Sequence, residues 1–491
     1  FLKVSGRNLL RNRGYTIINL VGLSSGIAVC LVILLFIRFE WNYEGFHPGA
    51  DRLYRVVQQF SDDPKDRTAG TGVPMAPNLQ LAFPEIEATV RIHQKEGLVQ
   101  VPGESERYRE TQIYYADSNF FEVFGFELLD GIPDEVLDAP GAAVITEDLA
   151  TKIFGKTDVV GRQIQIDEKL SLQISGVAAS PSKQSDLEFA LVANFRGMLT
   201  IYGSQKFESW WWPTVETYVR LTPENNVAAF THARVASFVE TYREPGLEVV
   251  PVLQPIQHIR RYGNPGARGT IMYMILFGII GAVVLLIACV NFMNLATARS
   301  AIRILEVGVK KAVGATRMSL IAQFFGESVL LASLAMILGL GLTELFLPSF
   351  ESISGYSLNV PWGSGAFWGL ILSTLLLTSI LAGLYPAIFM TQFGPLDALK
   401  QGKHQAGGGK RLRQGLVVFQ FIISATLITS TFLIQQQHQY MLSRELGYDQ
   451  QQVMVLELED AATVTSYPAL ADAINSMPQV QSVSSASWAP G

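Results

Sequence analysis

The residues that could do chemistry in this chain of 491 residues do not form a catalytic pattern. No His-Glu-x-x-His zinc motif and no cluster of paired cysteines occurs. Gly22-Leu23-Ser24-Ser25-Gly26 has the spacing Gly-x-Ser-x-Gly, but it lies within an apolar run and not at the strand-to-helix turn that such a nucleophile needs. Gly155-Lys156-Thr157 is similar to the end of a phosphate-binding loop, but the first glycine of that loop would stand where the chain has Ala150. The six histidines lack the spacing of metal ligands: His47, His93, His232, His258, His404 and His438. The sequence therefore predicts no catalytic residue, no metal and no cofactor.

A group of charged residues between positions 299 and 317 does have ordered spacing. Glu306 precedes Lys310 by four residues, the order that stabilises a helix, and Arg303 precedes Glu306 by three. Gly314 then supplies a helix stop. The pattern predicts a short charged helix along the membrane surface, where a cytosolic motor could push it. The alternative is a basic loop that only sets the topology.

The elements that must carry these residues are membrane helices. Hydrophobic residues make up 49% of the chain and charged residues 16%, below the quarter or so typical of soluble proteins. A membrane helix needs about 20 apolar residues to cross about 30 Å of hydrocarbon. Five segments have that length: 16–39, 269–298, 318–347, 366–391 and 415–435. A cleaved signal peptide is the alternative for the first, but its apolar run is too long and lacks a small-residue cleavage site.

The distribution of Lys and Arg predicts the orientation of these spans. Three segments rich in basic residues are assigned to the cytoplasm: 1–15, 299–317 and 392–414. The segment from Trp41 to Arg268 has 31 acidic and 21 basic residues and is assigned to the outer side. Lys3, Arg7 and Arg11 are four residues apart, so they would form a basic stripe on an amphipathic helix that contacts membrane lipid. An ordinary basic flank is the alternative.

The outer segment, 40–268, has the composition of an α+β domain. Runs typical of strands stand at 53–60, 142–146, 163–166, 172–177 and 217–221, and helical patterns at 74–92 and 228–242. Its length allows two lobes, and the second is expected at 102–140. Trp210-Trp211-Trp212 marks either a contact surface or core packing beside a turn. The predicted fold is a membrane α-helical bundle with a large α+β extracytoplasmic domain between the first and second spans.

Several stretches resemble one known family. Two segments, NFMNLA at 291–296 and RILEVGVKKAVGATR at 303–317, resemble the signature of MacB/FtsX-type ABC transporter permeases. The end of that family's last helix resembles GLYPA at 383–387 and PLDALK at 395–400. Its periplasmic core domain resembles FHP at 46–48, DRLYRV at 51–56 and FGK at 154–156, and the last of these accounts for the apparent phosphate loop. Val307 departs from the family, which more often has isoleucine there.

The resemblance implies a permease subunit without its own ATPase, paired with a separate cytosolic ATP-binding cassette subunit. It implies a multi-pass protein of the bacterial inner membrane, with 40–268 as a periplasmic MacB-like core domain. The ATPase would act on the coupling helix, 299–317, through seven residues: Arg303, Glu306, Gly308, Lys310, Lys311, Gly314 and Arg317. A periplasmic adaptor or an outer-membrane channel could complete the assembly. The net charge of −6 gives no indication of nucleic-acid binding.

The family's unit has one helix, a large outer domain and three further helices, which this chain completes by Lys400. The pattern then begins again with the span at 415–435, as in the eight-helix permeases in which two units are fused. Residues 436–491 are expected to begin a second periplasmic domain that is cut short, and both chain ends to be trimmed. The duplication suggests either an intrachain pseudo-dimer or a homodimer.

Two further sites are predicted within the spans. Gly22 and Gly26 form a small-xxx-small pair that would let the first span pack closely on a neighbour, unless they belong to a generic apolar span. Glu327 is an intramembrane acid, and it is either functional or a side chain that snorkels to the interface.

Three functions remain open at this stage. The resemblance implies ATP-driven export, or extraction from the outer leaflet, of an amphiphilic molecule: the motor would press on the coupling helix, tilt the second and third spans and move the outer domain. The alternative is a mechanotransmission subunit that moves no substrate and regulates a cell-wall hydrolase. A membrane-tethered enzyme is disfavoured by the missing catalytic constellation.

Overall fold

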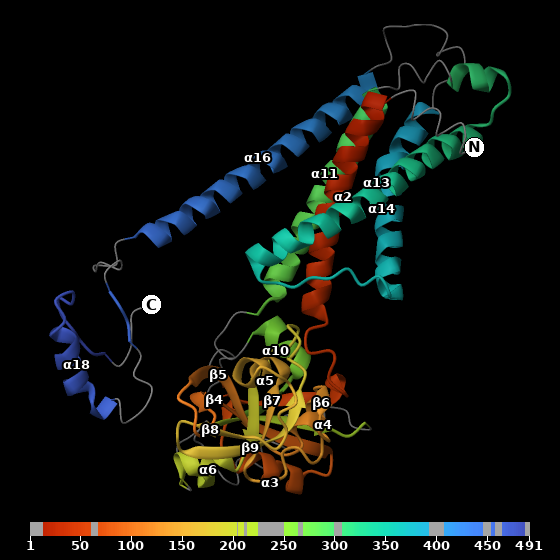
Figure 1. Ribbon diagram of the computed structural model, residues 1–491. Helices are drawn as coiled ribbons and strands as arrows, with labels where there is room; N and C mark the ends of the chain where they lie inside the picture. The colour runs from red at the N-terminus through yellow and green to blue at the C-terminus, as the bar shows by residue number, and fades with distance from the viewer. Residues whose placement is uncertain are drawn as a thin grey trace. The chain divides into compact units, whose positions relative to one another are not determined.

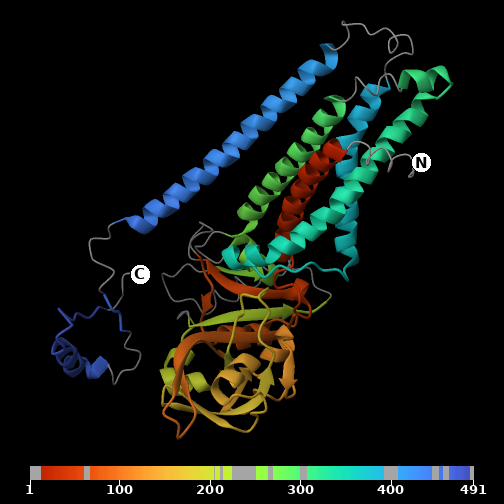
Figure 2. The same cartoon turned by 45° about the horizontal axis from the view of Figure 1, so that its top comes forward.

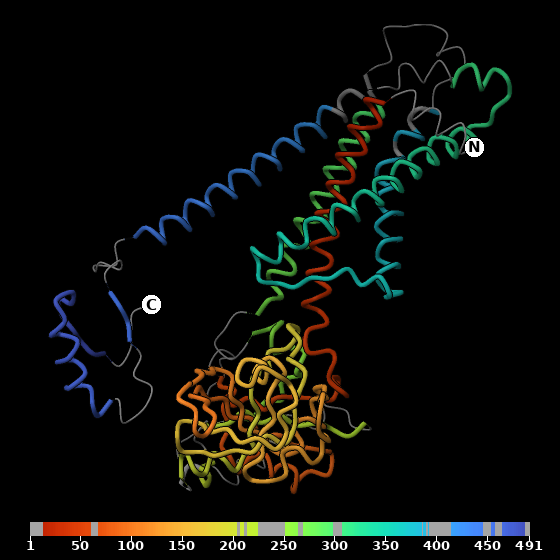
Figure 3. Tube along the Cα trace, in the orientation of Figure 1, coloured from red at the N-terminus to blue at the C-terminus, as the bar shows by residue number. Residues whose placement is uncertain are grey.

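The computed structural model describes residues 13–59, 67–203, 205–210, 214–223, 250–263, 269–298, 307–391, 407–444, 453–456 and 464–486. The chain divides into two compact units. One comprises residues 1–41 and 270–444, and the other comprises 42–269 and 445–491. The trace in Figure 3 follows the chain from the first unit into the second and back. The predicted helix at 228–242 and most of the predicted N-terminal helix at 1–15 lie outside the described residues.

Five helices among the described residues are long and apolar enough to cross a membrane (Figure 1). They are α2 (Arg13–Trp41), α11 (Ile271–Ala298), α13 (Arg317–Ser354), α14 (Gly365–Met390) and α16 (Gly407–Ser443). Each overlaps one of the five segments predicted as spans. Helices α13 and α16 continue past the predicted span ends at 347 and 435, and α16 begins within the predicted linker at 392–414.

Four of these helices pack into a bundle. Helix α2 contacts both α11 and α13, and α14 contacts α11 and α13 (Figure 2). Near one end of α2, the ring of Phe36 lies edge-on to Phe277 of α11 and to Tyr356, at centroid distances of 5.4 and 5.2 Å. Arg38 donates to the hydroxyl of Ser364 at 3.2 Å, just before α14. Aromatic and basic side chains of this kind are typical of membrane interfaces.

The outer unit is built on one sheet of 12 strands. Along the sheet the order is β12 (Val250–Pro255), β1 (Leu53–Gln59), β11 (Val215–Leu221), β4 (Ile86–Gln100), β5 (Arg107–Ala116), β10 (Leu191–Asn194), β7 (Ala142–Thr146), β9 (Leu170–Ala178) and β6 (Leu128–Asp130). Strands β2 (Arg67–Thr68), β3 (Gly70–Thr71) and β8 (Gln163–Ile166) pair beside this path. Neighbours are antiparallel except for the pairs β5–β10 and β7–β9.

Short helices cover the sheet and bury apolar side chains against it. Helix α4 (Phe120–Phe124) packs on one cluster, α5 (Glu147–Phe154) and α6 (Gly197–Tyr202) on a second, and α3 (Met75–Ala82) on a third. Other short helices among the described residues of this unit are η1 (Ala50–Arg52), α7 (Gln205–Glu208) and α10 (Ile256–Tyr262). Helix α18 (Tyr467–Asn475) buries none of its residues. Domain and bundle together confirm the predicted fold class.

One expectation for this domain is wrong. The helix predicted over 74–92 ends at Ala82, because Pro84 follows and the buried side chains then alternate as in a strand, from Ala88 to Val90 to Ile92 of β4. The segment 102–140, where a second lobe is expected, contributes β5 to the sheet between β4 and β10, and the division into two lobes stays a prediction. Periodicity is weak there because β5 is exposed along its first half and buried along its second.

Candidate functional site

The predicted coupling segment forms a tight corner before α13. Residues 307–312 are helical, and the helix stops at Gly314, whose φ of +97° a side-chain-bearing residue rarely adopts. The amides of Gly314 and Ala315 donate to the carbonyls of Lys311 and Lys310, each at 3.0 Å. Thr316 then caps α13 by accepting from the amide of Ser319 at 3.3 Å. Arg303 and Glu306 lie outside the described residues.

One side of this corner is fixed to two membrane helices. Val307 is buried in an apolar cluster with Leu320 and Phe324 of α13 and Ala387 of α14. Gly308 is buried beside it. Val307 therefore belongs to one apolar cluster that both α13 and α14 share. The sequence singled out Val307 only as a departure from the family, and no pattern indicated its burial.

Two lysines of the corner reach neighbouring helices. Lys311 Nζ donates to the backbone carbonyl of Thr391 at 2.8 Å, next to the C-terminal end of α14. Lysines stabilise a helix at that end, where carbonyls lack helical partners. Lys310 Nζ donates to Gln323 Oε1 of α13 at 3.0 Å. The predicted site residues Lys310 and Lys311 therefore attach the corner to the bundle.

The other side of the corner is exposed and largely apolar. Val309 and Val313 lie four residues apart, and Val313 is 84% exposed. Met318, at the start of α13, is also exposed. Gly314 and Arg317 are exposed beside them. We call Val309, Val313 and Met318 the apolar knob.

Glu327 lies in the interior of the bundle rather than at its surface. It is buried in α13 and lines a cavity of about 30 Å³ together with Tyr15 of α2, Phe292 of α11 and Pro386 of α14. A snorkelling side chain would reach an exposed position, which Glu327 does not, and a functional role for this acid stays a prediction.

Gly22 and Gly26 face α11, as expected for close helix packing. A Cβ atom at Gly26 would lie 2.6 Å from Ala288 Cβ, and one at Gly22 would lie 3.4 Å from Asn291 Nδ2. Two glycines that the sequence analysis missed are as tight: a Cβ at Gly339 would lie 2.8 Å from Ile27 Cγ2, and one at Gly383 2.6 Å from Ser328 Cβ. Both stand four residues from another small buried residue, Gly339 from Ala335 and Gly383 from Ser379 and Ala387, so the same small-xxx-small pattern could have found them.

A matched pair of substitutions tests this packing. Gly26→Ala is expected to lower the free energy of unfolding by about 1–3 kcal/mol, because the added methyl overlaps Ala288. Gly369→Ala in α14 is the control, since a Cβ there meets nothing within 4 Å. Denaturation of the detergent-solubilised chain in increasing SDS would measure both. Equal stability of the two variants would contradict a packing role for Gly26.

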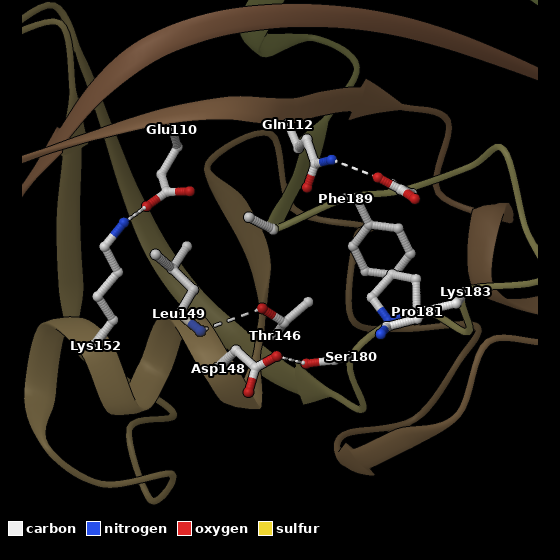
Figure 4. Close-up of a pocket in the computed structure, with 12 residues that line it drawn as sticks. Glu110, Gln112, Thr146, Asp148, Leu149, Lys152, Ser180, Pro181, Lys183 and Phe189 are labelled. Carbon is white, nitrogen blue, oxygen red and sulfur yellow. Dashed lines mark hydrogen bonds and ion pairs between the residues drawn. The ribbon is translucent and has the colours of Figure 1, made fainter. Parts of the chain in front are cut away.

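The outer domain has an open polar groove of about 320 Å³ (Figure 4). Its side chains pair with one another: Lys152 with Glu110, Gln112 with Glu188 at 2.8 Å, and Ser180 with Asp148 at 2.5 Å. These mutual pairs form no nucleophile–base arrangement. Among the described residues, no group of three or more His, Cys, Asp or Glu side chains could hold a metal ion. Trp210 is partly buried against the apolar cluster of α3, while Trp211 and Trp212 lie outside the described residues.

Two family models match the chain. The MacB-like periplasmic core domain matches residues 16–233, and the FtsX-like permease C-terminal region matches residues 278–395. The pyoverdine export ATP-binding/permease protein PvdT of Pseudomonas savastanoi pv. phaseolicola is 24% identical over 79% of this chain and 57% of its own length. The ABC transporter permease YvrN of Bacillus subtilis is 21% identical over 81% of this chain and 98% of its own length. This chain thus spans less than two thirds of the PvdT relative.

A solved structure also resembles part of the chain. The periplasmic region of MacB from Actinobacillus actinomycetemcomitans is 15% identical, and the match covers 39% of this chain and 84% of that structure, with a TM-score of 0.30.

Proposed function

The chain belongs to the MacB/FtsX-type permeases of ABC transporters, and from this premise we propose that it transmits the movement of a cytosolic ATPase to its outer domain. The observation that carries the proposal is the two-sided corner at 307–318. One side is anchored to α13 and α14 through Val307 and Lys311, and the other presents the apolar knob. A movement of an ATPase bound to the exposed side would displace the corner, and the anchored side would transmit that displacement to α13 and α14.

The ATPase is a separate subunit that covers the apolar knob. An exposed apolar cluster beside charged residues supports such a contact, because interfaces bury apolar side chains at their centre and keep charges at the rim. Lys310 and Arg317 lie beside the knob. This arrangement requires the corner to face the cytoplasm and the outer domain the periplasm of a bacterial inner membrane.

The cargo is an amphiphilic molecule that the protein exports or extracts from the outer leaflet. The relative PvdT, which is named as a pyoverdine exporter, supports this choice. A periplasmic adaptor or outer-membrane channel completes the path in that case. Affinity purification of the full chain from its own cells distinguishes the alternatives. Co-purification of an adaptor or channel agrees with export, whereas a cell-wall hydrolase in their place would favour regulation of that enzyme.

A single acidic substitution tests the contact with the ATPase. Val313→Asp is expected to weaken binding of the ATPase subunit by at least about tenfold, because it places a charge in the centre of the proposed interface. Ile353→Asp is the matched control, since Ile353 is 88% exposed and lies at the opposite end of α13. Titration of the purified ATPase subunit onto nanodisc-held permease measures both affinities. Equal binding by the two variants would argue against the knob as the docking surface.

A further inference from the structure

The two stretches that connect the outer domain to its membrane helices meet at one loop of that domain. The first stretch, 42–47, follows α2, which ends at Trp41. The second is α10, which ends at Tyr262 before α11 begins at Ile271. Residues 184–186, between β9 and β10, contact both.

The first stretch is held by a buried carboxylate. Glu44 is buried, and its carboxylate accepts from the Ser185 hydroxyl at 2.9 Å and from the Asp186 amide at 2.5 Å. His47 lies 2.7 Å from Glu44 Oε2 through Nε2, while its Nδ1 donates to the carbonyl of Phe124 at 2.7 Å. Removing any one of these partners would leave the buried carboxylate with an unsatisfied oxygen, which lowers the free energy of unfolding. The remaining contacts would then be weakened too.

The backbone of Glu44 also departs from what its residue type prefers. Its φ is +57°, in the left-handed region that favours glycine. The Glu44 amide donates to the carbonyl of Gln184 at 3.0 Å. Surrounding contacts must hold such a conformation in place, and residues of this kind concentrate at functional positions.

The second stretch is held by a half-exposed ion pair on the same loop. Arg260 of α10 lies 3.3 Å from Asp186 Oδ1, and the two side chains are 26% and 35% exposed. The guanidinium of Arg260 also donates to the Tyr43 hydroxyl at 3.0 Å and stacks 4.1 Å from the centre of the Tyr43 ring. Asp186 therefore contacts both connecting stretches: its amide and its carboxylate contact Glu44 and Tyr43 of the first, and its carboxylate pairs with Arg260 of the second.

We propose that Glu44, His47, Ser185, Asp186 and Arg260 form a joint that makes both connecting stretches move as one part with the outer domain. The proposal rests on the proposed function, because it specifies the residues through which helix movement reaches the domain. None of the five lies in the corner or on the apolar knob. We assign them a positioning role.

The two halves of the joint differ in what they contribute to folding. Glu44, His47 and Ser185 are buried, so their removal would also unfold the region. Asp186 and Arg260 are half-exposed, and burial, followed by the nearby charge of Glu44, raises the pKa of Asp186. Asparagine keeps the size and shape of the Asp186 side chain at this partly exposed position, so the neutral side chain should be tolerated. Asp186→Asn and Arg260→Met thus loosen the joint with little effect on folding.

The test measures movement and stability in the same full-length samples. Spin labels at Leu81 in the outer domain and at Ile353 on α13, both exposed, report the distance between domain and bundle with and without ATP, in nanodiscs that contain the ATPase subunit. In Asp186→Asn and in Arg260→Met, the ATP-dependent change in distance is expected to fall by at least about twofold. The unfolding temperature should stay near that of the parent protein.

Glu87→Gln is the matched control for Asp186→Asn. Glu87 is 38% exposed and pairs with Arg52 at 2.9 Å and with Arg220 at 3.0 Å, none of which is a joint residue. This variant should keep the full ATP-dependent change. A full change in both joint variants, or their outright unfolding, would overturn the joint alone. No ATP-dependent change in the parent protein would overturn the proposed function, and the joint with it.

Discussion

Val307→Asp is expected to reduce ATP-dependent activity by at least about 100-fold. Val307 is buried among Leu320, Phe324 and Ala387, all of them apolar, and Lys311, one turn further on, already donates to the carbonyl of Thr391. Burial of an unpaired charge costs several kcal/mol, and a cost of about 3 kcal/mol lowers the population of the docked corner by about 100-fold. The corner should therefore detach from α13 and α14, because this exposes the aspartate to water. ATP-driven function would then be lost although the ATPase can still bind the knob.

Hydrogen exchange and activity together check this result. Amides of residues 307–320 should exchange faster in Val307→Asp, while those of β4 and β5 in the outer domain remain protected. Val307→Ile is the control, because it adds one methylene to the same cluster and should cost less than about 1.5 kcal/mol. Normal ATP-driven activity in the aspartate variant would show that the corner does not need this anchor.

The second large effect is expected in the outer domain, for Phe120→Ala. Phe120 is buried and lies 5.1 Å from the ring centres of Phe121 and Phe124, and 5.6 Å from those of Phe126 and Phe189. Removing a buried aromatic ring costs about 3–5 kcal/mol. An outer domain whose free energy of unfolding falls by this amount would unfold locally and could not transmit force as a rigid body.

Leu81→Ala provides the contrast for that prediction. Leu81 is exposed at the end of α3, so its truncation removes almost no buried area. Denaturant unfolding, followed by hydrogen exchange of the sheet amides, should show a large loss for Phe120→Ala and almost none for Leu81→Ala. Similar stability of the two variants would contradict the assignment of the aromatic cluster as the domain core.

The membrane helices could be predicted well because lipid imposes a simple rule. A span needs a long apolar run, and the runs containing Leu31, Leu285 and Leu375 satisfy it. Strands with regular composition, such as β7 and β8, were predicted at the observed bounds. The prediction failed in β4, where the spacing of apolar residues suggested a helix that continues to residue 92. Pairing with β5 and β11 makes this segment a strand in spite of that local pattern.

The candidate site could be predicted only where charge and local spacing mark a residue. Lys310 and Lys311 are marked in this way. Val307 is not, because its burial depends on Leu320 and other residues more than ten positions away. The joint was missed for the same reason. His47 was dismissed as a metal ligand, and its partnership with Glu44 and Ser185 depends on a loop about 140 residues further along the chain.

The central claim is that the corner at 307–318 faces the cytoplasm while the outer domain faces the other side. Labelling of Val313→Cys by a membrane-impermeant maleimide tests it most directly, in a chain whose buried native Cys30 and Cys289 are replaced by alanine. Leu81→Cys serves as the outer-domain reference. In spheroplasts, Cys at position 81 should react at once and Cys at position 313 only after permeabilisation. Reaction at position 313 in sealed spheroplasts would contradict the whole account.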